Sequence, residues 1–131
     1  MLRDLKYEWA DGGVVREWSQ EEEIWKEIKE WEGLYEVSNH GRVRNMKRGN
    51  ILKIQENNQV SLYEKGRVKH KLVHYAMMEV FCPVKEEKEY EKTPRPRVPK
   101  SVFIERGYDP LLFYHRRNWW WECVLKREYS H

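Results

Sequence analysis

The sequence lacks any long apolar run, and this absence excludes a membrane-spanning helix. Such a helix needs roughly 20 consecutive apolar residues, and every apolar run here is far shorter. The N-terminal segment MLRDLKYEWADGG carries charges where a secretory signal has its apolar region. We therefore expect a protein located in the cytoplasm, without a membrane partner.

Cysteine and aspartate are both scarce. Cys82 and Cys123 lie far apart without a C-x-x-C pair, and no cluster of Cys and His has the spacing of zinc ligands. We expect two reduced, largely buried thiols and no cofactor. The only aspartates are Asp4, Asp11 and Asp109, which leaves few positions for any chemistry that depends on this residue.

Charged and aromatic residues are abundant instead. The 131 residues are 36% charged, 40% hydrophobic and 14% aromatic, a composition typical of one domain, or of one domain with a small appendage. The net charge of +3 is compatible with a nucleic-acid partner but does not require one. The distribution of charge along the chain is therefore more informative than its sum.

Turn residues predict two hairpins in the first third of the chain. Asp11-Gly12-Gly13 separates two short apolar and aromatic runs, as in a tight hairpin. Residues 19–28 are too short a run to establish a helix, and their structure is left open. Residues 34–44 alternate apolar and polar side chains around Asn39-His40-Gly41, which predicts a hairpin with one buried face and one basic face.

A further hairpin and a helix are predicted next. Residues 59–64 and 67–71 flank a Lys65-Gly66 turn and favour two paired strands. From Leu72 to Phe81 the apolar residues recur at helical spacing, and Pro83 ends the pattern. This is the best-defined helix of the sequence.

The composition changes after this helix. Residues 84–100 contain three prolines and many charges, which is typical of a linker or an extended arm. Beyond it we expect strands over Ser101–Glu105, Leu111–His115 and Trp119–Leu125, with a turn at residues 107–110.

Two stretches of the chain resemble a known family. EIWKEI at residues 23–28 and WEGLYEVSNHGRVRN at residues 31–45 are similar to the nuclease-associated modular domain that precedes the HNH nuclease in phage homing endonucleases. That domain begins E-x-W-K-x-I and continues E-G-x-Y-x-V-S-N-x-G-R-V-R. VKHKLV at residues 68–73 looks like the v-x-H-r-L-V segment that opens the HNH region of the same enzymes. The resemblance covers residues 23 to about 83 and implies a nucleic-acid partner, with duplex DNA favoured.

The predicted fold class is α+β. We expect a small antiparallel sheet of hairpins packed on one amphipathic helix, then a charged Pro-rich arm and a Trp-rich C-terminal β-like segment. The expected parts are an N-terminal hairpin or extension over residues 1–22, the nuclease-associated module over 23–83, the arm over 84–100 and an aromatic, basic segment over 101–131.

Positive charge gathers within the resembling stretch, and almost no acidic residue interrupts it. A basic strand face with polar neighbours can neutralise phosphates and place donors near base edges. The expected nucleic-acid-binding residues are Asn39, Arg42, Arg44, Lys47, Arg48 and Lys53. The alternative is a solvated edge hairpin whose charges only prevent strand pairing.

The residues of an HNH nuclease are missing where the resemblance would place them. Such a site brings His, Asp and Asn together around one divalent ion, in a segment like n-H-x-D-G-N-K and a later N-L-E-W-like stretch. Residues 84–100 contain no His, Asp or Asn. His115, Asn118 and Asp109 offer the residue types for a rearranged site. However, the three-residue spacing from His115 to Asn118 cannot span a strand and a helix, so we assign no catalytic residue.

A histidine pair is the other candidate for metal binding. His70 and His74 lie four residues apart, a spacing that can bind a metal, but no third ligand is close in the sequence. We expect a packing or hydrogen-bonding role for His70 and a satisfied or solvated His74. No metal-binding residue is assigned.

Three functions fit these observations. The favoured one is a nucleic-acid-binding protein derived from an HNH homing endonuclease that has lost catalysis. The second is a structural or interaction subunit of a larger assembly (a virion, a ribosome or a host-inhibitory complex), with a protein partner on residues 84–100 and Trp119–Trp121. The third is an active, divalent-metal-dependent HNH endonuclease with a rearranged site.

Overall fold

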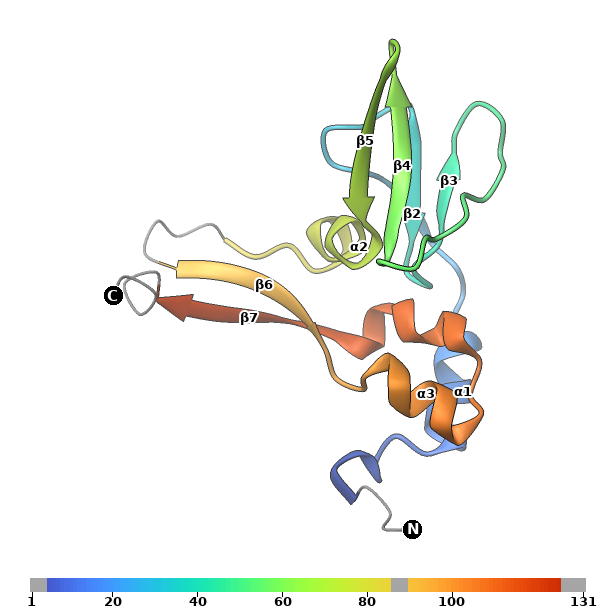
Figure 1. Ribbon diagram of the computed structural model, residues 1–131, viewed down its shortest axis with the longest axis vertical. Helices are drawn as coiled ribbons and strands as arrows, with labels where there is room; N and C mark the ends of the chain where they lie inside the picture. Colours follow the sequence, from blue (N-terminus) through green and yellow to red (C-terminus); the bar gives the residue numbers. More distant parts are fainter. Residues whose placement is uncertain (1–4, 86–89, 126–131) are drawn as a thin grey trace.

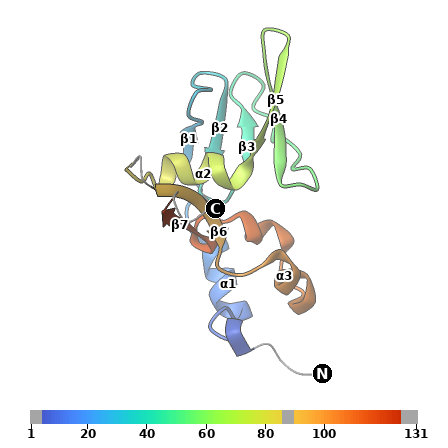
Figure 2. The same cartoon turned by 60° about the vertical axis from the view of Figure 1, so that its left-hand side comes forward.

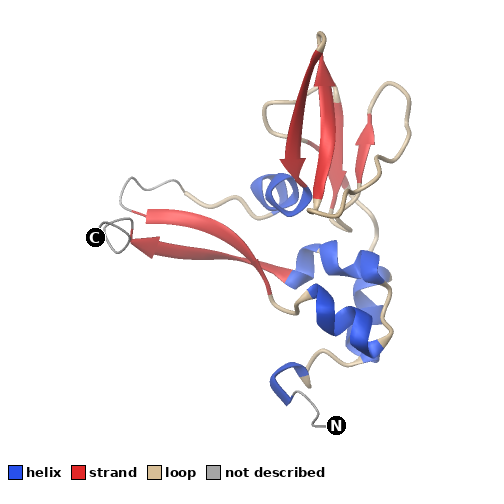
Figure 3. Cartoon of the chain, viewed as in Figure 1, coloured by secondary structure: helices blue, strands red, loops and turns tan. Residues whose placement is uncertain are grey.

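The computed structural model describes residues 5–85 and 90–125, and these residues have the predicted α+β fold. The elements are η1 (Leu5–Tyr7), α1 (Gly12–Ser19), β1 (Trp25–Glu27), β2 (Tyr35–Ser38), β3 (Val43–Asn45), β4 (Gln59–Glu64), β5 (Arg67–Leu72), α2 (Val73–Phe81), β6 (Tyr90–Pro96), α3 (Lys100–Arg106), η2 (Pro110–Tyr114), η3 (Arg116–Asn118) and β7 (Trp119–Leu125). Strands β1 to β5 form the upper part of Figure 1, and α1 and α3 form the lower part. Helix α2 and the β6–β7 ribbon lie between them, as the colouring in Figure 3 also shows.

The N-terminal segment is helical, so the hairpin predicted around Asp11-Gly12-Gly13 is wrong. Asp11 is the N-cap of α1, and its carboxylate accepts a hydrogen bond from the Val14 N–H at 2.9 Å. Val15 and Trp18 are three residues apart, share one face of the helix and are both buried. The Asp-Gly-Gly sequence suits a helix start as well as a hairpin turn, and the burial of this face favours the helix.

Strands β1, β2 and β3 form an antiparallel sheet in that order, which confirms the hairpin predicted over residues 34–44. Val37 of β2 pairs with Val43 of β3, and both side chains are fully buried. Glu36 pairs with Arg44 on the opposite face, because successive side chains of a strand alternate between faces. One face of the sheet therefore belongs to the core, and the other carries charge.

Strands β4 and β5 form the second predicted hairpin, closed by the Lys65-Gly66 turn. Val60 and Leu62 of β4 are fully buried. Tyr35 joins this hairpin to the three-stranded sheet. Its hydroxyl accepts a hydrogen bond from the Tyr63 N–H at 3.0 Å and donates to the Tyr63 carbonyl at 3.5 Å. The predicted helix follows directly as α2 and packs against both hairpins, which Figure 2 shows from a second direction.

The segment predicted as an arm over residues 84–100 is largely ordered by its own chain. Strand β6 pairs with β7 along its whole length, from Tyr90 to Pro96. Pro94 and Pro96 lack the N–H that a central strand needs, but β6 has a partner on one side only. Residues 86–89 lie outside the described residues. Because β7 holds the segment, its order gives no reason to expect a partner protein.

Two of the three strands predicted near the C-terminus are helical instead. Helix α3 occupies Ser101–Glu105, and η2 occupies most of Leu111–His115. Gly107, with φ of 72°, ends α3 in the left-handed conformation, and Asp109 caps η2 through its carboxylate. The third predicted strand, Trp119–Leu125, is confirmed as β7.

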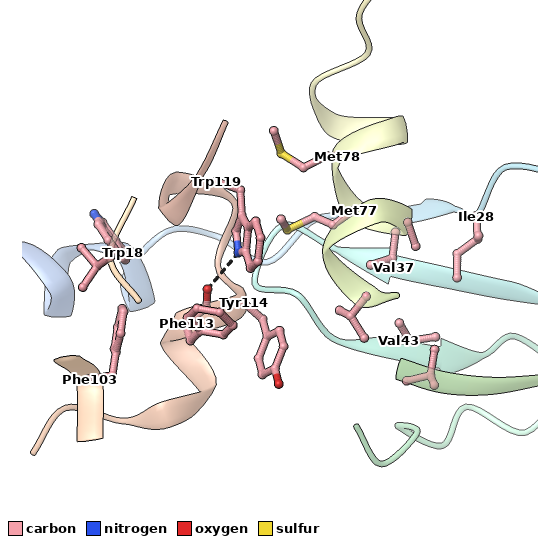
Figure 4. Close-up of a cluster of buried hydrophobic side chains, with 14 of the residues drawn as sticks. Trp18, Ile28, Val37, Val43, Met77, Met78, Phe103, Phe113, Tyr114 and Trp119 are labelled. Atoms are coloured by element: carbon pink, nitrogen blue, oxygen red, sulfur yellow. Dashed lines mark hydrogen bonds between the residues drawn. The ribbon is translucent and has the colours of Figure 1, made fainter. Parts of the chain in front are cut away.

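Trp119 lies between the buried side chains of α1, α3 and η2 and those of α2 and the β2–β3 hairpin, and joins them into one core (Figure 4). Its ring centroid lies 5.2 Å from that of Phe113 and 4.2 Å from that of His74 on α2. The indole N–H donates to the Phe113 carbonyl at 2.9 Å. Figure 4 shows Met77 of α2 on the other side of the same indole. No helix in the described part of the chain is long and apolar enough to cross a membrane.

Candidate nucleic-acid interface

Asn39, predicted as a nucleic-acid ligand, is buried and holds the backbone instead. Its side chain is 3% exposed. The amide oxygen accepts a hydrogen bond from the Ile24 N–H at 2.8 Å, and the amide nitrogen donates to the Glu22 carbonyl at 3.0 Å. Asn39 therefore fixes the segment that leads into β1, and this burial corrects its place in the predicted interface.

Gly41 lies in the same turn and is required by the packing of the C-terminal segment. Its φ of 76° is in the left-handed region, and a Cβ at this position would lie 2.2 Å from the Tyr114 carbonyl oxygen. The neighbouring Asn39 carbonyl accepts a hydrogen bond from the Arg116 N–H at 2.8 Å. The Ser38–Gly41 turn is thus the junction between the upper and lower parts of the molecule.

Arg42 is exposed but carries an acidic partner. Its Nε donates to Glu23 Oε2 at 2.7 Å, and its Nη2 contacts the other carboxylate oxygen of Glu23. This hydrogen-bonded pair lowers the pKa of Glu23 and raises the pKa of Arg42. The sequence places the two residues 19 positions apart, so their pairing follows from the fold.

Arg44 is also paired, with the carboxylate of Glu36 directly across the β2–β3 register. Its guanidinium carbon lies 3.9 Å from the centroid of the Trp25 ring, a cation–π contact. The strand alternation could have located Glu36 opposite Arg44 before the structure was known. The predicted basic face is therefore a set of ion pairs around Trp25.

Lys47 and Arg48 differ from these arginines, because both are exposed and neither forms an ion pair with any residue that the structure describes. They lie in the loop between β3 and β4. The Asn45 side-chain oxygen accepts hydrogen bonds from the Lys47 and Arg48 N–H groups at 2.9 and 3.0 Å. This side chain fixes the loop backbone while both cationic side chains point to solvent. Lys53 is exposed farther along the same connection.

Two further exposed cations, Lys65 and Arg67, lie at the tip of the β4–β5 hairpin. Within residues 5–85 and 90–125 neither has an ion-pair partner. Lys47, Arg48, Lys65 and Arg67 are together named the basic tips. They lie on the β3–β4 loop, in the β4–β5 turn and at the start of β5, at the end of the molecule farthest from α1 (Figure 1). The sequence predicted the hairpin turn at Lys65 but did not mark it as part of an interface.

A hollow of about 520 Å³ separates the two loops that carry the basic tips. Its lining residues are Leu34, Tyr35, Asn45, Lys47, Arg48, Tyr63, Glu64 and Lys65. Tyr63, with 62% of its surface exposed, is a further residue that sequence reasoning missed. The sequence could have revealed it, because Tyr63 is an aromatic residue at an outward position of β4. Val60 and Leu62 occupy the inward positions of this strand and are buried.

His115, a candidate by residue type for a rearranged nuclease site, is enclosed. Its side chain is 0% exposed, and its Nδ1 accepts a hydrogen bond from the Arg117 N–H at 3.1 Å. Its Nε2 lies 3.4 Å from Glu21 Oε2. The His40 and Trp18 rings lie 4.8 and 5.9 Å away, between centroids. Burial lowers the pKa of His115 to about 4, so the side chain is neutral at neutral pH. Because the side chain is enclosed, it cannot reach a substrate.

Asn118 and Asp109 do not approach a common site with this histidine. The Asn118 amide accepts from the Val98 N–H at 2.9 Å and donates to the Val98 and Phe113 carbonyls, both at 3.0 Å. Asp109 caps η2. No group of three His, Cys, Asp or Glu side chains among the described residues could hold a metal ion. Among the described residues, the side chains of His115, Asp109 and Asn118 therefore do not form the donor set of an HNH metal centre.

His70 and His74, the candidate metal-binding pair, have structural surroundings. His74 stacks on Trp119 with an interplanar angle of 1°, and burial lowers its pKa to about 4. His70 is exposed, and its Nδ1 lies 3.1 Å from Ser61 Oγ, which agrees with the predicted hydrogen-bonding role. Cys82 is partly buried and Cys123 is exposed, and both thiols are free, so the expected burial of both is wrong.

Comparison with known proteins supports a nuclease-associated domain in this chain. Residues 23–63 match the NUMOD4 motif, a motif found in HNH homing endonucleases. This stretch contains Lys47 and Arg48 together with the turn that carries Asn39 and Gly41. The recognised residues therefore include one pair of basic tips and the junction with the C-terminal segment.

The chain is also similar to the HNH homing endonuclease I-HmuI, a protein that binds and cleaves DNA. The two are 27% identical, the TM-score is 0.55, and the match covers 82% of this chain. The similarity thus extends well beyond residues 23–63. The match covers 55% of the length of I-HmuI. No curated protein matches the chain.

Proposed function

We propose that this chain is a nucleic-acid-binding protein derived from an HNH homing endonuclease, and that it binds duplex DNA through the basic tips without cutting it. The NUMOD4 match and the similarity to I-HmuI, which binds DNA, support the lineage and the partner. The observation that carries the proposal is the gathering, at one end of the module, of four exposed cations without an ion-pair partner in the described part of the chain.

The basic tips suit a polyanion for an electrostatic reason. A Lys or Arg that approaches a phosphate releases condensed counterions, and this release supplies much of the free energy of DNA binding. Lys47 and Lys65 can make such a contact without first giving up an ion pair. Arg42 and Arg44 must share their guanidinium groups with Glu23 and Glu36, which reduces their gain. We therefore place the main phosphate contacts at the basic tips and secondary contacts at Arg42 and Arg44.

Binding to duplex DNA across a salt series tests this assignment. Each phosphate contact contributes about 0.9 to the slope of log K against log salt, so Lys47→Ala with Arg48→Ala should lower the slope by about 2. Arg16→Ala is the control, because it removes a positive charge from exposed α1 at the far end of the molecule. Arg42→Ala with Arg44→Ala should lower the slope by less than about 1. Absence of binding at low salt would contradict the proposed function.

The absence of cutting is supported by the surroundings of the candidate catalytic residues. His115 is enclosed, Asn118 holds the backbone of Val98 and Phe113, and Asp109 caps a helix. Incubation of supercoiled plasmid with the protein and Mg²⁺ should leave the plasmid intact. Metal-dependent nicking that copurifies with the protein would overturn this part of the proposal and leave the binding part standing.

A further inference from the structure

The hollow between the basic tips contains an exposed aromatic ring, which contact with duplex phosphates does not require. We propose that this hollow accepts one unpaired nucleotide of a DNA strand, with its base stacked on Tyr63 and its phosphate held by Lys47, Arg48 and Lys65. This inference rests on the proposed function, because it names the form of nucleic acid that the same tips prefer.

One wall of the hollow is fixed by Tyr35. Its buried ring reaches from β2 to β4, and its hydroxyl binds both the N–H and the carbonyl of Tyr63. The next residues turn tightly, with positive φ at Lys65 (47°) and Gly66 (78°). The backbone that carries the Tyr63 ring and the Lys65 ammonium group is thus held in place before a ligand arrives, which limits the entropy lost on binding.

The opposite wall is fixed by Asn45. Its side-chain oxygen accepts the N–H groups of Lys47 and Arg48, and its own N–H donates to the Asn50 carbonyl at 3.0 Å. A hydrogen bond of 3.0 Å from the Met46 N–H to the Leu34 carbonyl joins the loop to the sheet. Both cationic side chains therefore start from a defined backbone beside the hollow.

Size and charge agree with a nucleotide. The volume of about 520 Å³ lies within the range of roughly 300–1,000 Å³ typical of small-molecule sites. Three cations and one carboxylate, that of Glu64, line it. The lining is therefore net positive and favours a phosphate, while the Tyr63 ring offers the apolar surface that a base needs.

The aromatic ring favours an unpaired base over a paired one. In a duplex the faces of the bases are covered by their neighbours, and a protein reaches only their edges. An unpaired base exposes its face, and proteins bind single strands with aromatic rings beside cationic grooves. Because Tyr63 is 62% exposed and lies beside three cations, its ring can stack on an unpaired base but has no comparable partner in an intact duplex.

Binding of an oligothymidine strand, and of a duplex of equal length, to Tyr63 variants tests the inference. Tyr63→Ala should weaken binding of the single strand by about tenfold, the effect of removing one stacked base, and binding of the duplex by less than about twofold. Tyr63→Phe should retain both affinities, because stacking needs the ring and not the hydroxyl. Val68→Ala is the matched control, since Val68 pairs with Tyr63 across the hairpin and is also exposed.

A 2-aminopurine base within the oligothymidine strand reports stacking directly. Its fluorescence should be quenched by the unchanged protein and by Tyr63→Phe, and should recover with Tyr63→Ala. Equal loss of single-strand and duplex binding in Tyr63→Ala, or no loss of either, overturns the inference while the duplex-binding function stands. Absence of binding to both forms of DNA overturns the proposed function itself.

Discussion

The two ends of the nuclease-associated module use their polar residues differently. At the Ser38–Gly41 turn, the Asn39 side chain is buried and hydrogen-bonded, and Gly41 lies against Tyr114. At the opposite end, the basic tips are exposed and lack carboxylate partners among the described residues. The residues of the Ser38–Gly41 turn thus serve largely to pack the module, whereas the residues most available to a ligand lie at its other end.

Among the variants that test this contrast, Gly41→Ala should have the largest effect on the free energy of unfolding. The new Cβ meets the Tyr114 backbone and the left-handed φ penalises any L side chain, so the free energy of unfolding should fall by at least about 3 kcal/mol. Gly49→Ala is the matched control, because Gly49 has a similar φ of 75° with nothing within 4 Å, and it should cost only about 1 kcal/mol. Urea unfolding compares the two. Equal losses of unfolding free energy in the two variants would mean that the Ser38–Gly41 turn is not the junction between the upper and lower parts of the molecule.

Asn39→Ala should come next and should separate packing from binding at the turn. It leaves the Ile24 N–H and the Glu22 carbonyl without their partner, which should lower the free energy of unfolding by about 2–3 kcal/mol. The salt slope of DNA binding should stay within about 0.3 of the unchanged protein. Asn50→Ala, on an exposed residue, is the control. A lower slope in the folded Asn39 variant would restore this residue to the interface.

The buried His115 should make stability depend on pH. Burial lowers its pKa to about 4 in the folded protein, below the roughly 6.5 of an unfolded histidine, so the unfolded chain takes up the proton first as pH falls. The contribution of neutral His115 to the free energy of unfolding is complete above about pH 6.5, and roughly 2 kcal/mol of it should be lost by about pH 5. Urea midpoints at the two pH values measure it. His115→Gln should remove this share of the dependence and leave the share of buried His74, whose pKa is also lowered to about 4, and His70→Gln, on an exposed histidine, should leave both.

Lys47→Ala with Arg48→Ala should have the smallest effect on stability. Both side chains are exposed and unpaired, so the free energy of unfolding should change by less than about 0.5 kcal/mol, although DNA binding weakens. Thermal unfolding and the salt series, measured on the same preparation, check the two halves of this statement. A large loss of stability would show that the tips have a packing role as well.

The sequence predicted the module better than the rest of the chain, for identifiable reasons. Alternation around Asn39-His40-Gly41 and helical spacing from Leu72 to Phe81 are local patterns, and the structure confirms both elements. The segments over Ser101–Glu105 and Leu111–His115 are too short for periodicity to separate strand from helix. Their burial against Trp18 and Trp119 is a long-range effect, so the strand predictions there are wrong.

The candidate site was predicted in a similarly uneven way. Lys47, Arg48 and Lys53 are exposed, as an interface needs, and their binding role stays a prediction. The pairing of Arg42 with Glu23 depends on the placement of the segment before β1, which Asn39 fixes. Tyr63 was missed because the opposite wall of the hollow, with Lys47 and Arg48, comes from a different part of the chain.

By itself, the sequence determined the α+β class, the two central hairpins, helix α2 and the family resemblance, because alternation, turn residues and motif spacing are local properties of the chain. The tertiary structure decided which charges are available. It paired Arg42 and Arg44 with carboxylates, enclosed Asn39 and His115, and left the basic tips exposed around a hollow, with no carboxylate partner in residues 5–85 and 90–125. Burial and ion pairing depend on which distant segments meet, and only the folded chain brings them together.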